Sequence, residues 1–381
     1  MQSSALGEKY GTWKEKCMKI CFGCMAGIPD QVTECPYCGF QLSSYRQSEN
    51  GLKPGIVLNK KYLIGRVLGE GGFGITYMSY DMNSHKKFAV KEYYPSMFVH
   101  RDNRVDEKTV QPISKSTISD FKEGMERYVK EAEILSRFFH LPGIVSVKDF
   151  FYENGTAYIA MEYVEGISLK EYLKRRGDKI AWDEMLGIMQ PLLQSMSVIH
   201  EAQIIHRDIS PDNIMVGNDG KITLIDFGAA RLVSGKEDKS KTVVLKHGYA
   251  PIEQYDSRGN QGPWTDIYSL CATMYKMLTG KVPCEASSRM AGTELLPPKR
   301  LNRKVPKYLS RAIMKGLEIN ANDRFQTVSE LYDELYSTRK ERRARVIRKF
   351  LKRLLSIVLI IFLAVVIFTG CLLYFAYKSG M

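Results

Sequence analysis

The stretches HRDISPDN at residues 206–213 and DFG at residues 226–228 decide the fold of this 381-residue chain. A short strand-like run, KITLI at 221–225, separates them. Upstream, residues 69–76 read GEGGFGIT with strand-like runs on both sides. Because glycine lacks a Cβ and tolerates positive φ angles, such a loop lets the backbone approach phosphate groups. The flanking strands disfavour the strand-to-helix setting of a dinucleotide site.

Lys91 stands seventeen residues after Gly74, at the end of the apolar run FAVK. A lysine on an apolar strand is a poor core residue unless its charge meets an anion. A phosphate and a carboxylate would supply that need.

With the glycine loop, the lysine and the two later motifs in this order, residues 60–337 resemble the eukaryotic-type (Hanks-type) serine/threonine protein kinases, in a bacterial-like form. The resemblance implies an α+β, two-lobed protein kinase fold, with a small β-rich lobe before a larger helical lobe. The order of strand-like and helical periodicities agrees with it. The expected function is transfer of the γ-phosphate of ATP to a serine or threonine hydroxyl of a protein substrate.

The resemblance assigns the catalytic roles residue by residue. Asp208 would accept the proton of the substrate hydroxyl, and Asn213 and Asp226 would bind Mg²⁺. Lys91 would contact the α- and β-phosphates and pair with Glu131, because EAEIL at 131–135 fits the register of the family. Two other helix carboxylates stay open as alternatives, Glu133 and Glu126.

The resemblance also places the nucleotide. Met161 would be the gatekeeper, and Glu162 to Val164 would form the hinge. The apolar positions fit ordinary core packing as well. The residues expected around ATP are Leu68, Gly69, Gly71, Gly74, Thr76, Ala89, Lys91, Met161, Glu162, Val164 and Met215.

One position departs from the family pattern. Two residues after the catalytic aspartate the family has a lysine that contacts the γ-phosphate, whereas this chain has Ser210. Seven residues before Glu253, where the family has a threonine that touches this lysine, the chain has Lys246. We expect Lys246 to supply the missing charge in catalysis. The alternative is a solvated Lys246 and a slow or inactive enzyme.

Further motifs of the resemblance are structural. Glu253 in YAPIE at 249–253 would pair with Arg324, and Asp266 would brace the catalytic loop. Arg207 beside Asp208 suggests an activation segment ordered by phosphate. The hydroxyls available there are Ser234, Ser240 and Thr242.

Two C-x-x-C pairs lie in residues 17–40, and residues 41–59 read as a polar linker. The thiolates of Cys21, Cys24, Cys35 and Cys38 suit one tetrahedral Zn²⁺, as in a zinc ribbon with a structural ion. Cys17 is a fifth candidate, and a redox pair or disulfides are the alternatives. Since no catalytic group lies there, kinase activity is expected to survive loss of the module.

The C-terminal part predicts a membrane anchor. Residues 354–377 carry no charge over 24 positions, whereas about 20 apolar residues cross a bilayer as a helix. The basic juxtamembrane segment, 338–353, holds nine Lys or Arg and one Glu. The positive-inside rule therefore places residues 1–353 on the cytoplasmic side of the cell membrane, in a single-pass topology. A buried core helix is the alternative for 354–377.

The net charge of +13 comes mostly from that one segment, so nucleic acid is not an expected partner. Protein substrates and the membrane are the expected partners, together with a second copy of the chain in a dimer for autophosphorylation. Two other functions stay open: a pseudokinase scaffold that binds nucleotide or proteins without efficient catalysis, and a kinase for small molecules. The presence of Lys91, Asp208, Asn213 and Asp226 together argues against the scaffold.

Overall fold

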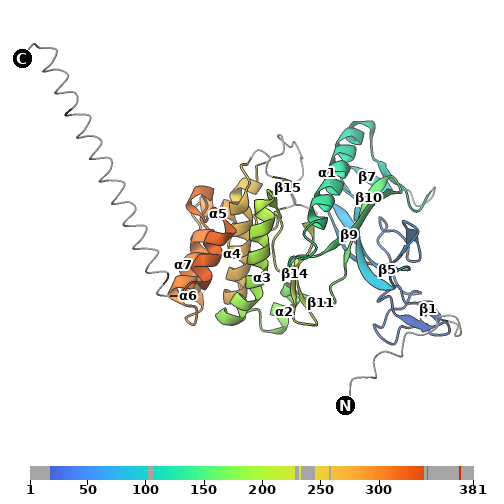
Figure 1. The fold of residues 1–381 in the computed structure, drawn as a ribbon, viewed down its shortest axis with the longest axis horizontal. Helices are drawn as coiled ribbons and strands as arrows, with labels where there is room; N and C mark the ends of the chain where they lie inside the picture. The colour runs from blue at the N-terminus through green and yellow to red at the C-terminus, as the bar shows by residue number, and fades with distance from the viewer. Residues whose placement is uncertain are drawn as a thin grey trace, which may run out of the picture.

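The computed structural model describes residues 18–101, 106–227, 231–232, 245–256 and 259–338, together with Glu341 and Thr369. Two lobes follow one another along the long axis (Figure 1). One lobe contains the large sheet and helix α1, and the other contains the remaining helices. This is the two-lobed α+β arrangement that the sequence predicts.

The small lobe is an antiparallel sheet in the order β3-β4-β5-β6-β10-β9. Helix α1 (Ile118–Ser136) covers it and turns Phe121, Tyr128, Val129, Ala132 and Leu135 inward, as expected for an amphipathic helix. The bounds of the strands are β3 (Val57–Leu58), β4 (Tyr62–Gly71), β5 (Gly74–Asp81), β6 (Lys86–Tyr93), β9 (Val147–Glu153) and β10 (Thr156–Glu162).

The region between the Lys91 strand and α1 contains a short hairpin, β7 (Val99–Arg101) and β8 (Val110–Pro112). Arg101 forms a fully buried ion pair with Glu92 of β6. The hydroxyls of Tyr77 and Tyr158 donate to the same carboxylate at 2.7 and 2.6 Å. Burial raises the pKa of Glu92, against the opposing effect of Arg101. These bonds anchor the hairpin to the sheet.

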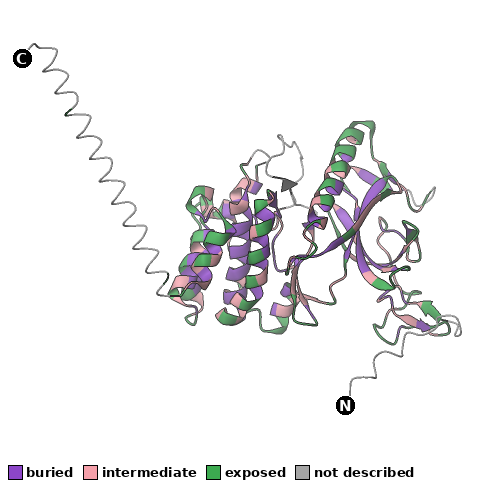
Figure 2. Ribbon diagram, viewed as in Figure 1, coloured by how far each residue is buried: buried purple, intermediate pink, exposed green. Residues whose placement is uncertain are grey.

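The large lobe is built around α3 (Trp182–Glu201) and α4 (Pro263–Thr279), whose buried faces appear purple in Figure 2. Gly280, at a φ of 74°, ends α4. The other helices are α2 (Leu169–Arg175), α5 (Ala286–Met290), α6 (Pro298–Leu301), α7 (Lys307–Gly316) and α8 (Val328–Tyr336). The short strands are β11 (Gly166–Ser168), β12 (Ile204–Ile205), β13 (Ile214–Gly217), β14 (Ile222–Leu224) and β15 (Arg231–Leu232).

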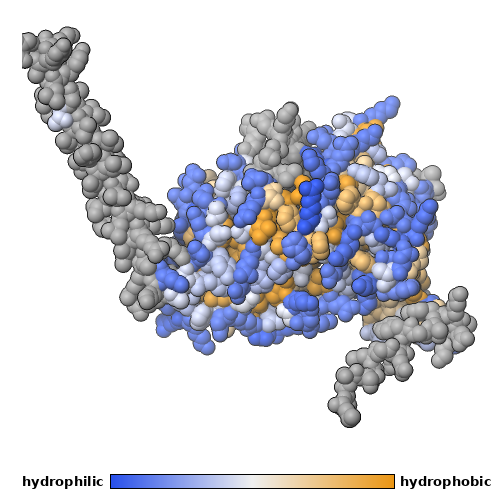
Figure 3. All heavy atoms as spheres, in the orientation of Figure 1, coloured by the Kyte–Doolittle hydropathy of each residue, from blue (hydrophilic) through white to orange (hydrophobic). Residues whose placement is uncertain are grey.

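Hydrophobic residues gather in the middle of the face shown in Figure 3, and hydrophilic residues cover most of its outer parts. The main apolar core is continuous from the small lobe into the large one, since Ala89 and Ala132 share it with Leu192 and Leu270. The two lobes are therefore packed together rather than merely tethered.

Part of the expected linker belongs to the small lobe. Leu52 and Leu58 are fully buried in its core, and β3 pairs with β4 within residues 57–63. The prediction of a linker through residue 59 is thus wrong for its second half, because these apolar side chains extend the sheet and its core. The cysteine module before it contains the hairpin of β1 (Met18–Ile20) and β2 (Gly27–Pro29).

The expected membrane helix at 354–377 and most of the basic segment at 338–353 lie outside the described residues. Across the part of the chain that is described, no helix is both long and apolar enough to span a bilayer. The expected activation-segment hydroxyls at 234, 240 and 242 and the fifth cysteine at 17 also lie outside it.

Candidate active site

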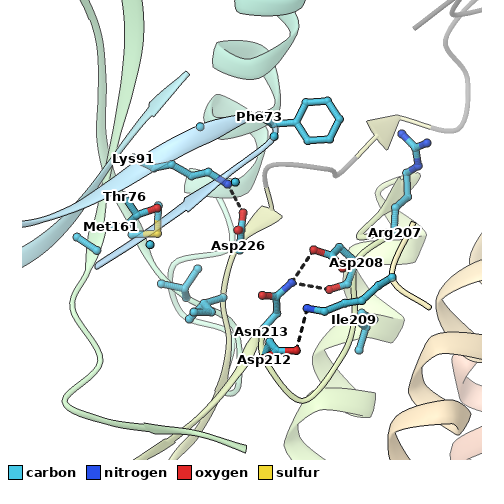
Figure 4. A pocket seen from close by; sticks show the side chains of 18 of the residues that line it. Phe73, Thr76, Lys91, Met161, Arg207, Asp208, Ile209, Asp212, Asn213 and Asp226 are labelled. Carbon is cyan, nitrogen blue, oxygen red and sulfur yellow. Dashed lines mark hydrogen bonds and ion pairs between the residues drawn. The ribbon is translucent and has the colours of Figure 1, made fainter. Parts of the chain in front are cut away.

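A cavity of about 680 Å³ is lined by residues of both lobes. Every residue that the sequence predicts for nucleotide binding or catalysis contributes to its lining, from Leu68 in β4 to Lys246 before the helix α4. Figure 4 shows Lys91, Thr76 and Met161 on the sheet side of the cavity, facing the loop that carries Asp208 and Asn213. The separate motifs thus meet at one place.

Strand register explains the sheet side. Thr76 of β5 lies opposite Lys91 of β6, and Met161 of β10 lies opposite Ala89 of β6. A Cβ added to Gly74 would lie 2.4 Å from the carbonyl oxygen of Glu92, so only glycine allows this close approach. Adjacent strands therefore present the lysine and the pocket residues together.

Lys91 is buried and forms an ion pair with Asp226. Asp226 itself has a φ of 64°, a left-handed conformation that non-glycine residues rarely adopt and that clusters at functional sites. The expected ion pair between Lys91 and Glu131 is not formed within the described residues. The ammonium group of Lys91 is paired with the Asp226 carboxylate instead.

Glu131 nevertheless lines the same cavity. Burial raises the pKa of Glu131 to about 8, although the positive charges of Arg207 and Arg127 act in the opposite direction. A carboxylate without a close cation favours its neutral form in such surroundings. Glu131 is therefore placed for the expected pair but does not make it in this conformation.

The catalytic loop is held by hydrogen bonds. The Asn213 side-chain amide donates to the Asp208 backbone carbonyl at 2.7 Å and to Asp208 Oδ2 at 2.8 Å. The Asp266 carboxylate accepts the backbone amides of His206 and Arg207, both at 2.8 Å. Asp266 therefore braces the loop, as the sequence predicts. Burial raises the pKa of Asp266, but these bonds and His200 outweigh it, so the net shift is downward.

The oxygen donors of this site suit magnesium. The side-chain nitrogen of Asn213 donates a hydrogen bond to Asp208, which leaves the amide oxygen of Asn213 as a possible metal ligand. Asp226 adds a carboxylate to the same cavity. Mg²⁺ prefers such hard oxygen ligands, with water and phosphate completing the shell. Asn213 and Asp226 are thus the residues that would hold the ion.

Ser210 and Lys246 differ sharply in their surroundings. Ser210 is completely buried, and its hydroxyl has no hydrogen-bond partner among the described residues. Lys246 lines the cavity, and its Nζ lies 3.2 Å from Asp212 Oδ2. The Lys246 carbonyl accepts the amides of Tyr249 and Ala250, which fixes the backbone there. A cation thus approaches the catalytic loop from the activation segment.

The end of that segment is tied to the large lobe. Arg324 and Glu253 form two parallel bonds of 2.7 and 3.0 Å, and their side chains are 0% and 9% exposed. This confirms the predicted pairing of these two residues. The Thr265 hydroxyl adds a third bond to Glu253 at 3.0 Å.

Some lining residues were not predicted for the site from the sequence. Arg127 and Tyr128 come from α1, Tyr249 from the activation segment and Asp212 from the catalytic loop. Asp212 is paired with both Lys246 and Lys170. The sequence could have indicated that Asp212 lies in the site, because Asp212 directly precedes the predicted magnesium ligand Asn213.

The four cysteines predicted to bind metal lie together. Their Sγ atoms are all within 4.8 Å of one another, and two pairs, Cys21–Cys38 and Cys24–Cys35, are 3.7 Å apart. A tetrahedral ion with Zn–S bonds of about 2.3 Å separates its sulfurs by about 3.8 Å. The cluster therefore has the dimensions of a zinc site.

The family model of the protein kinase domain matches residues 62–356. The chain belongs to the protein kinase family. A solved structure, the apo form of PpkA-294, is similar with a TM-score of 0.63 and 32% identity, over 75% of this chain and 99% of the other. The kinase fold predicted from the motifs is thereby confirmed.

Curated relatives are serine/threonine-protein kinases by name. PrkC of Bacillus subtilis (strain 168) is 29% identical over 280 residues, which cover 72% of this chain and 40% of that protein. PknA of Nostoc sp. is 30% identical over 289 residues, covering 73% and 47%. The chain thus spans less than half the length of these relatives. Serine/threonine specificity, which the sequence predicts for this chain, is also what the names of these relatives state for them.

Proposed function

We propose that this kinase transfers the γ-phosphate of ATP to serine or threonine hydroxyls of protein substrates. The observation that carries the proposal is the convergence of Lys91, Asp208, Asn213 and Asp226 on one cavity. A pseudokinase scaffold would not require all four residues to line the same space. The names of the curated relatives support serine and threonine as acceptors.

Each residue has a role that its position permits. Lys91 neutralises charge on the α- and β-phosphates, while Leu68, Ala89 and Met161 enclose the adenine. Asp208 orients the acceptor hydroxyl and takes its proton as the phosphoryl group leaves the β-phosphate. Phosphoryl transfer needs positioning and charge neutralisation more than covalent help. Magnesium, when held by Asn213 and Asp226, supplies further positive charge.

The conformation described here precedes the active one in this proposal. Lys91 is engaged by Asp226, and the kinase reaction requires both the lysine–glutamate pair and an aspartate bound to magnesium. Release of Asp226 to the ion would free Lys91 for Glu131, which already lines the cavity.

Incubation of the full chain with labelled ATP, Mg²⁺ and a generic protein acceptor tests the activity. We expect phosphoserine or phosphothreonine with the native chain and none with Asp208→Asn. Unchanged labelling in Asp208→Asn, at equal ATP binding, would contradict the proposed mechanism. Nucleotide binding without any transfer by the native chain would favour the scaffold.

We further propose a structural zinc ion at Cys21, Cys24, Cys35 and Cys38 and a single membrane helix at 354–377. The sulfur spacing supports the first proposal, and the uncharged length of sequence supports the second. Residues 1–353 then face the cytoplasm, and a dimer would permit phosphorylation between copies. Ending the chain at Thr338 is expected to move the kinase from the membrane fraction to the supernatant.

A further inference from the structure

Strand β4 is irregular just before it enters the nucleotide cavity. Its register with β5 shifts between Ile64 and Val67 and again between Val67 and Gly69. Pairing with β3 ends earlier, at Leu63. In the register with β5, Gly65 and Arg66 have no partner and Val67 lies opposite Tyr77, so the segment 65–67 also takes partners from outside the sheet.

Residues of the cysteine module and its C-terminal extension supply those partners. The amide of Arg66 donates to the carbonyl of Phe22 at 2.8 Å, and the amide of Val67 donates to the Tyr45 hydroxyl at 2.9 Å. The Arg66 side chain donates through Nε to the carbonyl of Gly23 at 2.9 Å. The backbone amide and the side-chain Nε of Arg66 thus both bind the turn between Cys21 and Cys24.

That turn is part of the predicted zinc site. The amide of Gly23, one residue away from Phe22, donates to Cys21 Sγ at 3.3 Å. Amide-to-sulfur bonds of this kind orient metal ligands. Beyond Cys21 and Cys35, the only buried residue of the small cluster inside the described part of the module is Ile28. Such a core cannot fix the turn without an ion.

Gly65 shows how closely the two parts approach. A Cβ at Gly65 would lie 2.2 Å from Met25 Cε and 2.3 Å from the carbonyl oxygen of Phe22. All three of its nearest atoms belong to Phe22 and Met25 of the module. Met25 is itself buried, at 4% exposure. The module is therefore docked on β4 and is not a loosely tethered appendage.

We propose that the zinc-held turn of the module positions β4 for ATP binding, so that nucleotide affinity depends on the zinc ion. Leu68 and Gly69 line the cavity and follow Val67 directly. Loss of the ion frees the turn, and Arg66 loses the two carbonyls that hold it. The roof of the adenine pocket then samples other conformations, which weakens ATP binding. This inference rests on the proposed zinc site, and it replaces the expectation that the module is dispensable for the kinase.

Four forms of the full chain test it: the native chain, Cys35→Ser, Gly65→Ala and, as a matched control, Tyr37→Ser. Tyr37 lies between two of the cysteines with 74% exposure, so its loss should disturb neither zinc nor docking. Zinc content is measured by elemental analysis, and the ATP dissociation constant by direct binding with Mg²⁺. Neither readout requires turnover.

We expect one zinc and unchanged affinity in Tyr37→Ser. Cys35→Ser should lose the ion, and Gly65→Ala should keep it, while both bind ATP about tenfold more weakly, a change of about 1.4 kcal/mol. If Gly65→Ala does not fold, Tyr45→Phe removes the bond to Val67 in its place. A zinc-free Cys35→Ser that binds ATP like the native chain overturns the proposal. If the native chain contains no zinc, the proposed metal site is wrong. If the native chain binds no ATP, the proposed kinase function is wrong instead.

Discussion

Lys246 Nζ lies 3.2 Å from Asp212 Oδ2, so a cation from the activation segment contacts the catalytic loop one residue before Asn213. The same carboxylate is 3.0 Å from Lys170 Nζ, but Lys170 is an exposed residue that does not line the cavity. The two lysines therefore share a partner, but of the two only Lys246 lines the cavity. That difference makes them a matched pair for mutation.

Lys246→Ala is expected to lower the turnover number about a hundredfold, or about 3 kcal/mol, because a charge near the transferring phosphoryl group is lost. Ser210 cannot compensate, since its hydroxyl is neutral and buried. Steady-state kinetics with saturating ATP would measure the change. Lys170→Ala is the control and should keep its turnover number.

An equal loss in both lysine variants would show that Asp212, rather than the cation, is what the reaction needs. A native turnover number in Lys246→Ala would contradict the hypothesis that Lys246 replaces the lysine that the family has at the position of Ser210.

Local motifs made the site predictable. The glycine loop, Lys91, HRDISPDN and DFG each contain their functional side chains within a few residues, and the fold brings them to one cavity. The family motifs also predicted the pairing of Glu253 with Arg324 and the role of Asp266, but other relations between distant segments were not predicted. The partner of Lys91 depends on how α1 is placed relative to Asp226. The linker prediction failed because Leu52 and Leu58 pack into the core of the small lobe against residues distant in the sequence. The docking of the Phe22 turn on Arg66 has no local signal at all.

Glu131→Gln should stabilise the ATP-free protein at alkaline pH and impair its activity. The pKa of Glu131 is raised by burial to about 8, from an ordinary value of about 4.5. The folded state thus binds a proton that the unfolded state has lost, and stability falls as pH rises from about 4.5 through 8. Glutamine resembles the neutral carboxyl and removes this fall.

Thermal unfolding without nucleotide between pH 5 and 9 would measure the effect. The native chain should lose stability relative to Glu131→Gln above pH 5, whereas Glu133→Gln, an exposed neighbour on α1, should parallel the native chain. Kinase activity should fall in Glu131→Gln only, because glutamine offers Lys91 no charge. Parallel melting curves for all three proteins would refute the idea that Glu131 is the titrating group.

Arg101→Met should destabilise the small lobe strongly. It removes the cation from a fully buried pair and leaves Glu92 with two tyrosine hydroxyls, so we expect a loss of about 3–5 kcal/mol. The guanidinium also binds the backbone of Asn50 and Lys108, and the change therefore detaches the β7–β8 hairpin from the segment leading to β3.

Arg137→Met is the control, because its pair with Glu133 is exposed and contributes at most about 0.5 kcal/mol. Chemical denaturation of the three proteins at neutral pH measures the difference. The double variant Arg101→Met with Glu92→Gln should recover part of the loss, since the stranded charge is removed. If Arg101→Met unfolded at the same denaturant concentration as Arg137→Met, the attachment of the hairpin through Arg101 would not contribute to the stability of the small lobe.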